Sequence, residues 1–272
     1  MRIDIERLCF GYGRGSEILH DVSLSLEGPG LVCIVGPNGV GKSTLIKCIN
    51  GVLTPTSGRV SIDGTDVRDL GRKELALKVG YVPPKTEELF AMPVMDAVMI
   101  GRHNLQGWRN TEEDVARVAS IMKLMDIDDL AMRPFNRLSS GQHQRVSIAR
   151  GLAQETPVLL LDEPTSNLDV KHQIYVAEML RGVADVMDKL IVMISHDLNI
   201  AAKYADDIAV MCEPGRVYAH GKPSDVITRE MVREVYGVDC TIESHGGIPH
   251  VVLGSVLPSS NSILRNPTRV QQ

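Results

Sequence analysis

A short glycine-rich segment constrains the fold of this chain more than any other stretch. It matches the pattern G-x-x-x-x-G-K-[ST] at Gly36, Gly41, Lys42 and Ser43. The apolar run just before it predicts a buried strand, and the apolar residues just after it recur at helical spacing. A glycine-rich turn alone carries no chemistry, but a strand, such a turn and a helix in this order predict a phosphate-binding loop.

The chemistry of this loop follows from its backbone. Glycines let backbone amides approach phosphate oxygens closely, and the N-terminus of the next helix adds about half a positive charge. We expect Lys42 to reach the β- and γ-phosphates of a nucleotide, and the Ser43 hydroxyl to bind Mg2+. The predicted nucleotide-binding residues are Gly36, Pro37, Asn38, Gly39, Val40, Gly41, Lys42, Ser43 and Thr44.

Composition limits the remaining possibilities. The 272 residues are 43% apolar, which is enough for a sizeable core, and the net charge of -5 argues against a nucleic-acid partner. The five cysteines never form a C-x-x-C pair, so we expect free thiols, not a disulfide framework or a zinc site. We expect no signal peptide, and the apolar runs are far shorter than the roughly 20 residues that cross a bilayer. A membrane role therefore requires a partner.

The pattern of elements predicts an α/β fold. Continuous apolar runs at Leu31–Val35, Val158–Leu161 and Leu190–Ile194 predict strands buried on both faces, and a helix is expected over Lys171–Met187. Strands alternating with helices indicate a mostly parallel sheet. Alternating segments before the loop and after its helix predict a small antiparallel sheet, and the pattern between Met92 and Ala153 is helical.

Two further groups of polar residues follow predicted strands, where ligands of α/β sheets bind. Asp162 and Glu163 come directly after Leu161. We interpret Asp162 as the residue that secures Mg2+ and Glu163 as the base that polarises the attacking water; two surface acids at a strand end are the alternative. His196 follows the next strand, where a neutral imidazole can bond a γ-phosphate oxygen, although a lone histidine is more often structural.

Ser139, Ser140, Gly141 and Gln142 open a predicted helix in the helical region. The serines suit the N-cap, and the amides behind them form an anion site. Capping alone also explains the serines. Because this site lies on a different lobe from the phosphate loop, we expect any phosphate bound there to belong to a nucleotide held by another subunit. Tyr12, in a glycine-rich turn, is either an adenine-stacking platform or an exposed turn residue.

Five motifs together make the chain resemble the ATP-binding-cassette (ABC) ATPases over residues 1 to about 220. They are the phosphate loop, Leu138-Ser139-Ser140-Gly141-Gln142, Leu161-Asp162-Glu163-Pro164-Thr165, Ser166-Asn167-Leu168-Asp169 and Ser195-His196-Asp197. The resemblance implies a phosphate-loop NTPase core with a small antiparallel subdomain and an inserted helical subdomain. We expect an ATPase domain at 1–222 (core 1–85 and 156–222, helical subdomain 86–155), a C-terminal helix and short β extension at 223–258, and, because the last stretch is polar, a flexible tail at 259–272.

The same resemblance implies the roles of the site residues. Two chains pair head to tail and hold two ATP molecules, so that Ser139, Gly141 and Gln142 close over the nucleotide bound by the partner. Asp169 then lies at the dimer seam, Glu163 is the general base and His196 senses the γ-phosphate. The family has glycine where Ser140 stands. ATP and Mg2+ are the expected ligands.

One departure from the family pattern is larger. The family usually has Gln after Tyr-Val-Pro, where it contacts Mg2+ or the attacking water and links the nucleotide to the membrane partner. Here Pro84 follows Tyr81-Val82-Pro83, and proline has no side-chain donor or acceptor. Our hypothesis is that water fills that coordination position and that Mg2+ is less tightly coupled to the helical lobe.

The resemblance narrows further to importer ATPases for iron chelates, haem and cobalamin, through Val98–His103 and the stretch Val235–His250. It implies a homodimer that works a separate transmembrane permease from the cytoplasmic face of the membrane, with an extracytoplasmic solute-binding protein as indirect partner. The rivals are a soluble cassette ATPase, an importer for another solute and a non-catalytic scaffold. His245 and His250 suggest a metal site, but a polar turn fits better because no third ligand is evident.

Overall fold

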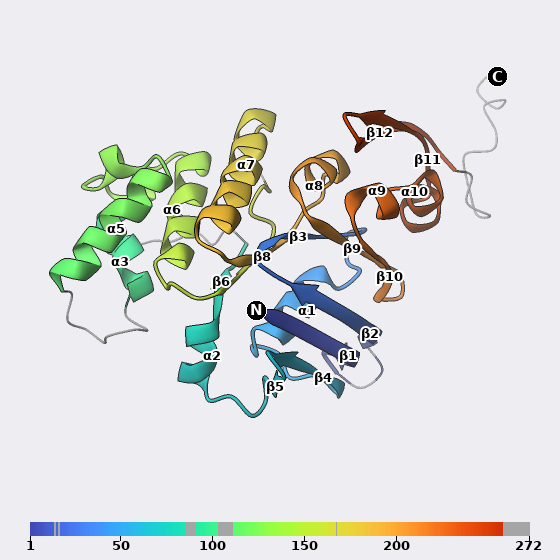
Figure 1. Cartoon of the computed structure of the whole chain (residues 1–272), viewed down its shortest axis with the longest axis horizontal. Coiled ribbons are helices and arrows are strands. Elements are labelled where there is room, and N and C mark those ends of the chain that lie inside the picture. The colour runs from blue at the N-terminus through green and yellow to red at the C-terminus, as the bar shows by residue number, and fades with distance from the viewer. Residues whose placement is uncertain (14, 16, 85–90, 103–110, 167, 258–272) are drawn as a thin grey trace, which may run out of the picture.

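The computed structural model describes residues 1–13, 15, 17–84, 91–102, 111–166 and 168–257. Within these residues the strands form three sheets, and a lobe of helices projects to one side of them (Figure 1). The predicted flexible tail, 259–272, lies outside the described residues. In this part of the chain no helix is both long enough and apolar enough to span a bilayer.

The central sheet has six strands in the order β10-β9-β3-β8-β7-β6. Strand β10 is antiparallel to β9, and the other neighbours are parallel. This confirms the predicted α/β class with a mostly parallel sheet. The strands are β3 (Gly30–Val35), β6 (Val79–Val82), β7 (Val158–Leu161), β8 (Leu190–Ile194), β9 (Asp207–Cys212) and β10 (Arg216–Gly221).

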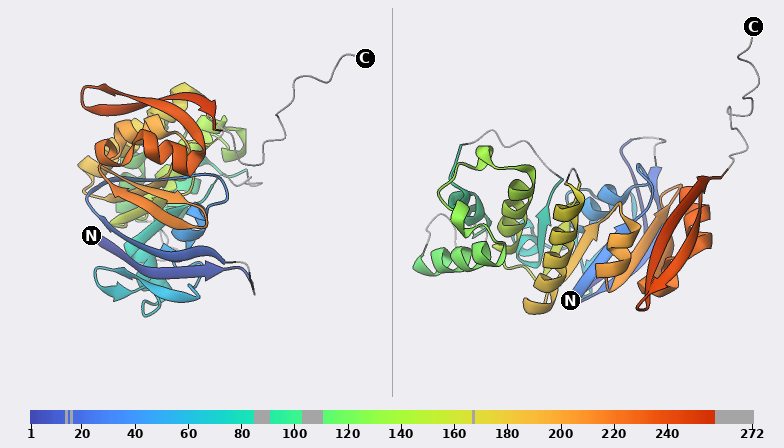
Figure 2. Two further views of the ribbon diagram at one scale, coloured as in Figure 1. Left: turned by 90° about the vertical axis from the view of Figure 1, so that its right-hand side faces the viewer. Right: turned by 90° about the horizontal axis from the view of Figure 1, so that it is seen from above.

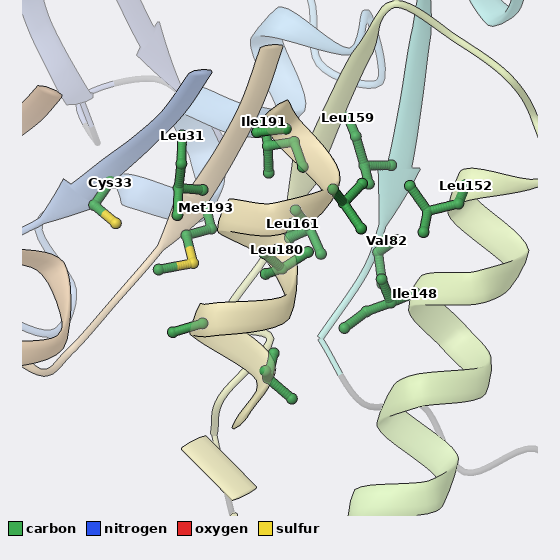
Figure 3. Packing of buried hydrophobic residues seen from close by; sticks show 14 of the residues in the cluster. Leu31, Cys33, Val82, Ile148, Leu152, Leu159, Leu161, Leu180, Ile191 and Met193 are labelled. Carbon is green, nitrogen blue, oxygen red and sulfur yellow. The ribbon is translucent and has the colours of Figure 1, made fainter. Parts of the chain in front are cut away.

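Both faces of this sheet are covered, which explains the uninterrupted apolar runs. Leu31 and Cys33 of β3 face one core cluster, in which Leu180 of helix α7 (Val170–Val186) packs on the sheet (Figure 3). Val32 and Ile34 face the opposite cluster, which contains helix α1 (Lys42–Ile49) and the inner side of the small sheet. Alternate residues of one strand thus hold two separate layers in place.

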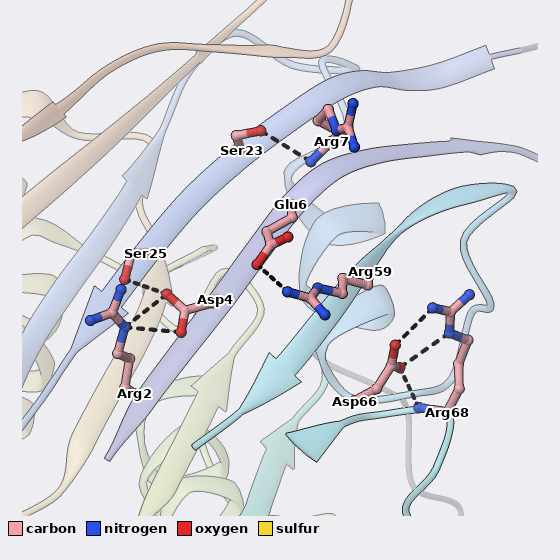
Figure 4. A network of polar contacts seen from close by, with 9 residues as sticks. All are labelled: Arg2, Asp4, Glu6, Arg7, Ser23, Ser25, Arg59, Asp66 and Arg68. Carbon is pink, nitrogen blue, oxygen red and sulfur yellow. Dashed lines mark hydrogen bonds and ion pairs between the residues drawn. The ribbon is translucent and has the colours of Figure 1, made fainter. Parts of the chain in front are cut away.

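The small sheet is antiparallel, as predicted, with the order β2-β1-β4-β5. Its strands are β1 (Arg2–Gly11), β2 (Glu17–Glu27), β4 (Ser57–Ile62) and β5 (Thr65–Asp66). Its outer face carries exposed polar pairs, such as Arg59 of β4 with Glu6 of β1 at 2.7 Å and, within β1, Arg2 with Asp4 at 2.8 Å (Figure 4). Exposed pairs of this kind contribute little to stability because water screens them, so burial of the inner face holds this sheet in place.

The helical lobe is built around a buried ion pair. Arg102 Nε lies 2.9 Å from Asp114 Oδ1, and a second guanidinium nitrogen lies 2.8 Å from Glu155. Asp114 also completes a capping box with Thr111 at the start of α5. After α3 (Val94–Met99) the chain tightens into a 3-10 turn, Ile100–Arg102, that carries Arg102 inward. The lobe contains α3 (Val94–Met99), the 3-10 turns Ile100–Arg102, Asp128–Leu130 and Phe135–Arg137, α5 (Glu112–Leu124) and α6 (Ser140–Leu152).

The remaining elements lie outside these layers. Helix α2 (Arg72–Lys78) precedes β6, and α8 (Leu198–Tyr204) follows β8. The C-terminal stretch forms α9 (Pro223–Val226), α10 (Arg229–Tyr236) and a two-stranded hairpin of β11 (Val238–His245) and β12 (Ile248–Val256). This hairpin lies against α8, on the far side of the molecule from the helical lobe (Figures 1 and 2). The domain boundaries given above stay predictions.

Candidate functional site

The glycine-rich loop joins β3 to α1 and is built so that only glycine fits at its ends. Gly36 has φ 149°, and a Cβ there would lie 2.3 Å from the carbonyl oxygen of Met211. Gly41 has φ 101° and is the N-cap of α1, which has no side-chain cap. The amides of the first turn therefore keep no partner from a capping side chain, which is the arrangement that binds an anion at a helix N-terminus.

Lys42 is buried and folds back onto this loop. Its ammonium donates hydrogen bonds to the carbonyl oxygens of Gly36, at 2.8 Å, and Pro37, at 2.7 Å. Burial lowers the pKa of Lys42, and the nearby charges of Glu163 and Asp162 oppose that shift. A cation held by two carbonyl oxygens beside uncapped amides can transfer its hydrogen bonds to phosphate oxygens.

Ser43 and Asp162 meet although they are far apart in sequence. The Ser43 hydroxyl donates to Asp162 Oδ1 at 2.7 Å, and the Tyr81 hydroxyl donates to Oδ2 at 3.3 Å. Strands β6 and β7 pair in parallel just before this point, with Val82 beside Leu161. A hydroxyl and a carboxylate are oxygen ligands of the kind that Mg2+ prefers, so these residues fit the predicted ion. Tyr81 was not predicted, and burial raises its pKa.

Glu163 and His196 also lie together, at the ends of β7 and β8. His196 Nε2 lies 2.8 Å from Glu163 Oε1. Glu163 has φ 54°, a left-handed conformation that is unusual for a residue other than glycine and that is often found at functional sites. Directly after His196, the carboxylate of Asp197 accepts hydrogen bonds from two amides of α8 and fixes the start of that helix.

Ser139, Ser140, Gly141 and Gln142 form the beginning of α6, on the helical lobe (Figure 1). Ser139 and Gln142 make a capping box: the Ser139 hydroxyl accepts from the Gln142 amide, and the Gln142 side chain accepts from the Ser139 amide. Both serines are exposed, and Gly141 is buried. The structure thus places the predicted serines on the surface, at a helix N-terminus and on a different lobe from the phosphate loop.

A residue that the sequence interpretation missed explains the burial of Gly141. A Cβ on Gly141 would lie 2.8 Å from Cδ2 of His172. His172 Nδ1 lies 2.7 Å from Asp169 Oδ1, and the same oxygen accepts from the His172 amide and caps α7. These hydrogen bonds lower the pKa of Asp169, the backbone bond most. The only sequence signal was local: a histidine three residues after an N-cap aspartate.

The other predicted residues lie apart from this group. Tyr12 is 60% exposed, and the rings of Phe10 and Tyr12 meet edge to face at 5.0 Å. Pro84 is exposed, two residues after the end of β6. The rings of His245 and His250 lie 5.9 Å apart beside a two-residue turn, and no third ligand joins them to form a metal-binding cluster among the described residues. All five cysteines are free thiols.

Comparison with known proteins bears on this arrangement. The family model described as ABC transporter matches residues 19–166. An uncharacterized ABC transporter ATP-binding protein of Methanocaldococcus jannaschii is 40% identical over 252 residues, 93% of this chain and 98% of that protein. The ferric enterobactin transport ATP-binding protein FepC of Escherichia coli is 34% identical, covering 95% of this chain and 97% of its own length. The hemin import ATP-binding protein HmuV of Rhodococcus jostii is 36% identical, covering 89% and 81%.

Solved structures agree. The cbiO1 protein of Clostridium perfringens, part of the ABC transporter complex cbiONQ, superposes with a TM-score of 0.75 at 32% identity, covering 85% of this chain and 92% of that one. The ATP-binding cassette MJ0796, in a dimeric post-hydrolysis state with ADP and Pi, superposes with a TM-score of 0.70 at 29% identity, covering 81% of this chain and 98% of that one.

Proposed function

The chain belongs to the ABC transporter family, and from this premise we propose that it is the ATP-hydrolysing nucleotide-binding subunit of an importer. One observation carries the proposal. A continuous set of contacts joins the phosphate loop to the strand ends, through Ser43 with Asp162 and Glu163 with His196. A chain that bound ATP only to hold two copies together would not need a carboxylate and an imidazole in contact beside the lysine.

The proposed roles follow from this arrangement. The loop amides and Lys42 bind the phosphates and offset charge that develops on the transferred group. Glu163 accepts the proton of the attacking water, and His196 holds the Glu163 carboxylate in position and contacts the γ-phosphate. Ser43 and Asp162 hold Mg2+, which when bound neutralises charge on the β- and γ-phosphates. Tyr12 provides the stacking surface for adenine.

The second half of the site comes from another copy of the chain. The exposed Ser139 and Ser140, with the half-buried Gln142, close over the nucleotide held by the partner's phosphate loop, and Asp169 lies at the seam. A dimeric relative with ADP and Pi supports this arrangement. ATP binding closes the dimer, hydrolysis reopens it, and the movement works a separate permease at the cytoplasmic face of the membrane.

The proposed cargo is an iron(III)-siderophore, haem or cobalamin. Relatives named as ferric enterobactin and hemin transport proteins support the first two, and the resemblance at Val98–His103 and Val235–His250 adds the third. An extracytoplasmic solute-binding protein is the expected indirect partner. Co-purification with a permease, followed by uptake assays with each cargo, tests this assignment.

The Glu163→Gln variant tests the proposed function. Removing the base while keeping the shape should lower phosphate release at least about 100-fold and leave ATP bound, so that an ATP-dependent dimer accumulates. Sedimentation velocity with and without ATP measures it. Glu178→Gln, an exposed position of the same type on α7, is the matched control. A monomer with normal turnover would refute the assignment, and parental turnover near zero would favour a non-catalytic scaffold.

Pro84 offers a second test, on how Mg2+ is held. Proline supplies no ligand there, and Pro84 is exposed, so we propose that water fills this coordination position. The Pro84→Gln variant should reduce the Mg2+ concentration needed for half-maximal turnover by several-fold and strengthen stimulation by the permease. Unchanged Mg2+ dependence together with unchanged stimulation would show that position 84 plays no part.

A further inference from the structure

The C-terminal hairpin is fixed to the helix that begins beside the proposed catalytic histidine. Asn199, in the first turn of α8, pairs with the backbone of Val251 in β12 through both atoms of its amide. The side-chain nitrogen donates to the Val251 carbonyl at 3.2 Å, and the side-chain oxygen accepts from the Val251 amide at 2.7 Å. Since α8 starts two residues after His196, the hairpin lies close to the edge of the sheet that carries the site.

An apolar surface lies between this hairpin and α7. A cavity of about 400 Å³ has Val170 and Ile174 of α7 on one side and Ile248 and Pro249 of the hairpin on the other. Val170 is 70% exposed and Ile248 is 38% exposed. Apolar side chains gathered in one hollow at the surface of a chain are typical of an interaction site.

This surface continues into the proposed site. A second cavity, of about 420 Å³, has Ser166 and His196 at one side and Tyr236 and Leu253 of the C-terminal extension at the other. The two cavities share Gln173, Asp197 and Asn199 in their walls. A single groove therefore runs from His196 along the junction of α7 and α8 to the tip of the hairpin.

We propose that a second copy of this chain covers this groove when the ATP-bound dimer closes, so that the hairpin tip becomes part of the dimer interface. The inference rests on the proposed function, because continuity with the seam identifies the occupant. Val170 directly follows Asp169, the proposed seam residue, and Ser166 and His196 line the other end of the groove. The nucleotide-dependent contact and the apolar patch are thus parts of one surface.

The size of the patch defines its role. A stable interface needs about 800 Å² from each partner, which a few side chains at a hairpin tip do not supply. The patch therefore adds to a seam that ATP creates, and it does not hold two copies together without ATP. Loss of the patch should weaken the ATP-bound dimer and leave ATP binding by the single chain unchanged.

The test uses the full chain carrying Glu163→Gln, with Mg-ATP, and measures the dimer dissociation constant by sedimentation. Ile248→Asp is the deciding variant, and Val256→Asp is its control at the other end of β12, where the side chain is 78% exposed. Val170→Asp and Val186→Asp form the same comparison on α7; Val186 is 77% exposed. A negative side chain stabilises a helix near its N-terminus and destabilises it near its C-terminus. Any loss of stability is therefore expected in Val186→Asp, the control, and not in Val170→Asp.

We expect Ile248→Asp and Val170→Asp each to raise the dissociation constant at least about tenfold over their controls, with unchanged binding of a fluorescent ATP analogue by the dilute single chain. A dissociation constant for Ile248→Asp equal to that of Val256→Asp overturns the hairpin's part in the seam, whatever Val170→Asp does. If the Glu163→Gln parent itself forms no ATP-dependent dimer, the proposed function fails and this inference fails with it.

Discussion

Two helix N-termini of this chain are arranged for phosphate in opposite ways. Helix α1 begins at Gly41 without a side-chain cap, and its first turn is surrounded by Lys42, Ser43 and Asp162 of the same chain. Helix α6 begins with a complete capping box between Ser139 and Gln142, and Ser139 and Ser140 are both exposed. The first end has no side chain that caps its amides, and the second is already capped by its own residues.

This difference indicates separate roles for the starts of α1 and α6. An uncapped helix start carries orphan amides that a bound anion satisfies, so α1 gains most when phosphate arrives. A capped start is worth about 1 kcal/mol to its own helix, so α6 needs no ligand to keep its shape. We therefore expect changes at α1 to impair nucleotide binding itself, and changes at α6 to impair only the closure of two copies.

The largest effect is expected at the phosphate loop. Lys42→Met should lower phosphate release at least about 100-fold and remove the rise in melting temperature that ATP causes, because the cation that binds the phosphates is gone. Burial lowers the pKa of Lys42 in the folded chain. Between this lowered pKa and the ordinary value of 10.5 the unfolded chain binds more protons, so the Lys42 contribution to stability rises with pH across that window. The variant should lose that rise. Melting curves of the ATP-free chain at several pH values check the pH dependence. For nucleotide binding, an ATP-induced rise in melting temperature as large as in wild type would contradict the proposed role of Lys42.

A large effect on turnover alone is expected at α6. Ser140→Glu places an acid in the first turn of a helix, where it suits the dipole, but sets a negative charge against the partner's triphosphate. Turnover should fall at least about 100-fold, whereas the ATP-induced rise in melting temperature should stay. Ser224→Glu, at the start of α9, is the control. Loss of ATP binding in Ser140→Glu would break the contrast between the two ends.

The smallest effect on the chemistry is expected in the helical lobe. Asp114 is buried, and its pKa is lowered first by the Thr111 amide and then by the Arg102 guanidinium. A lowered pKa contributes stability above the unfolded value near 3.9, and this contribution disappears as the pH falls through the folded value. Asp114→Asn should lower the melting temperature by several degrees at pH 7, and by less as the pH falls below about 4. Equal differences at both pH values would show that the ion pair does not set the stability of the lobe.

Much of this arrangement could be predicted from the sequence, because strand ends and phosphate loops follow local rules. The run Val158–Leu161 predicted a doubly covered strand and thereby placed Asp162 at its carboxyl end. Tyr81, His172 and Asn199 could not be found in this way. Each contacts a residue that is distant in sequence, or depends on the direction in which its side chain points. The spacing of apolar residues predicts neither. The roles of the site residues themselves remain predictions.

Mixing two variants measures whether each copy completes the other's site. Lys42→Met and Ser140→Glu chains, each inactive alone, are mixed and assayed for phosphate release. A mixed dimer contains one intact site, made from the phosphate loop of one copy and the α6 end of the other. Mixing should restore a substantial fraction of wild-type turnover, with a maximum near equal proportions. Turnover that stays at the level of the separate variants at every ratio would contradict it.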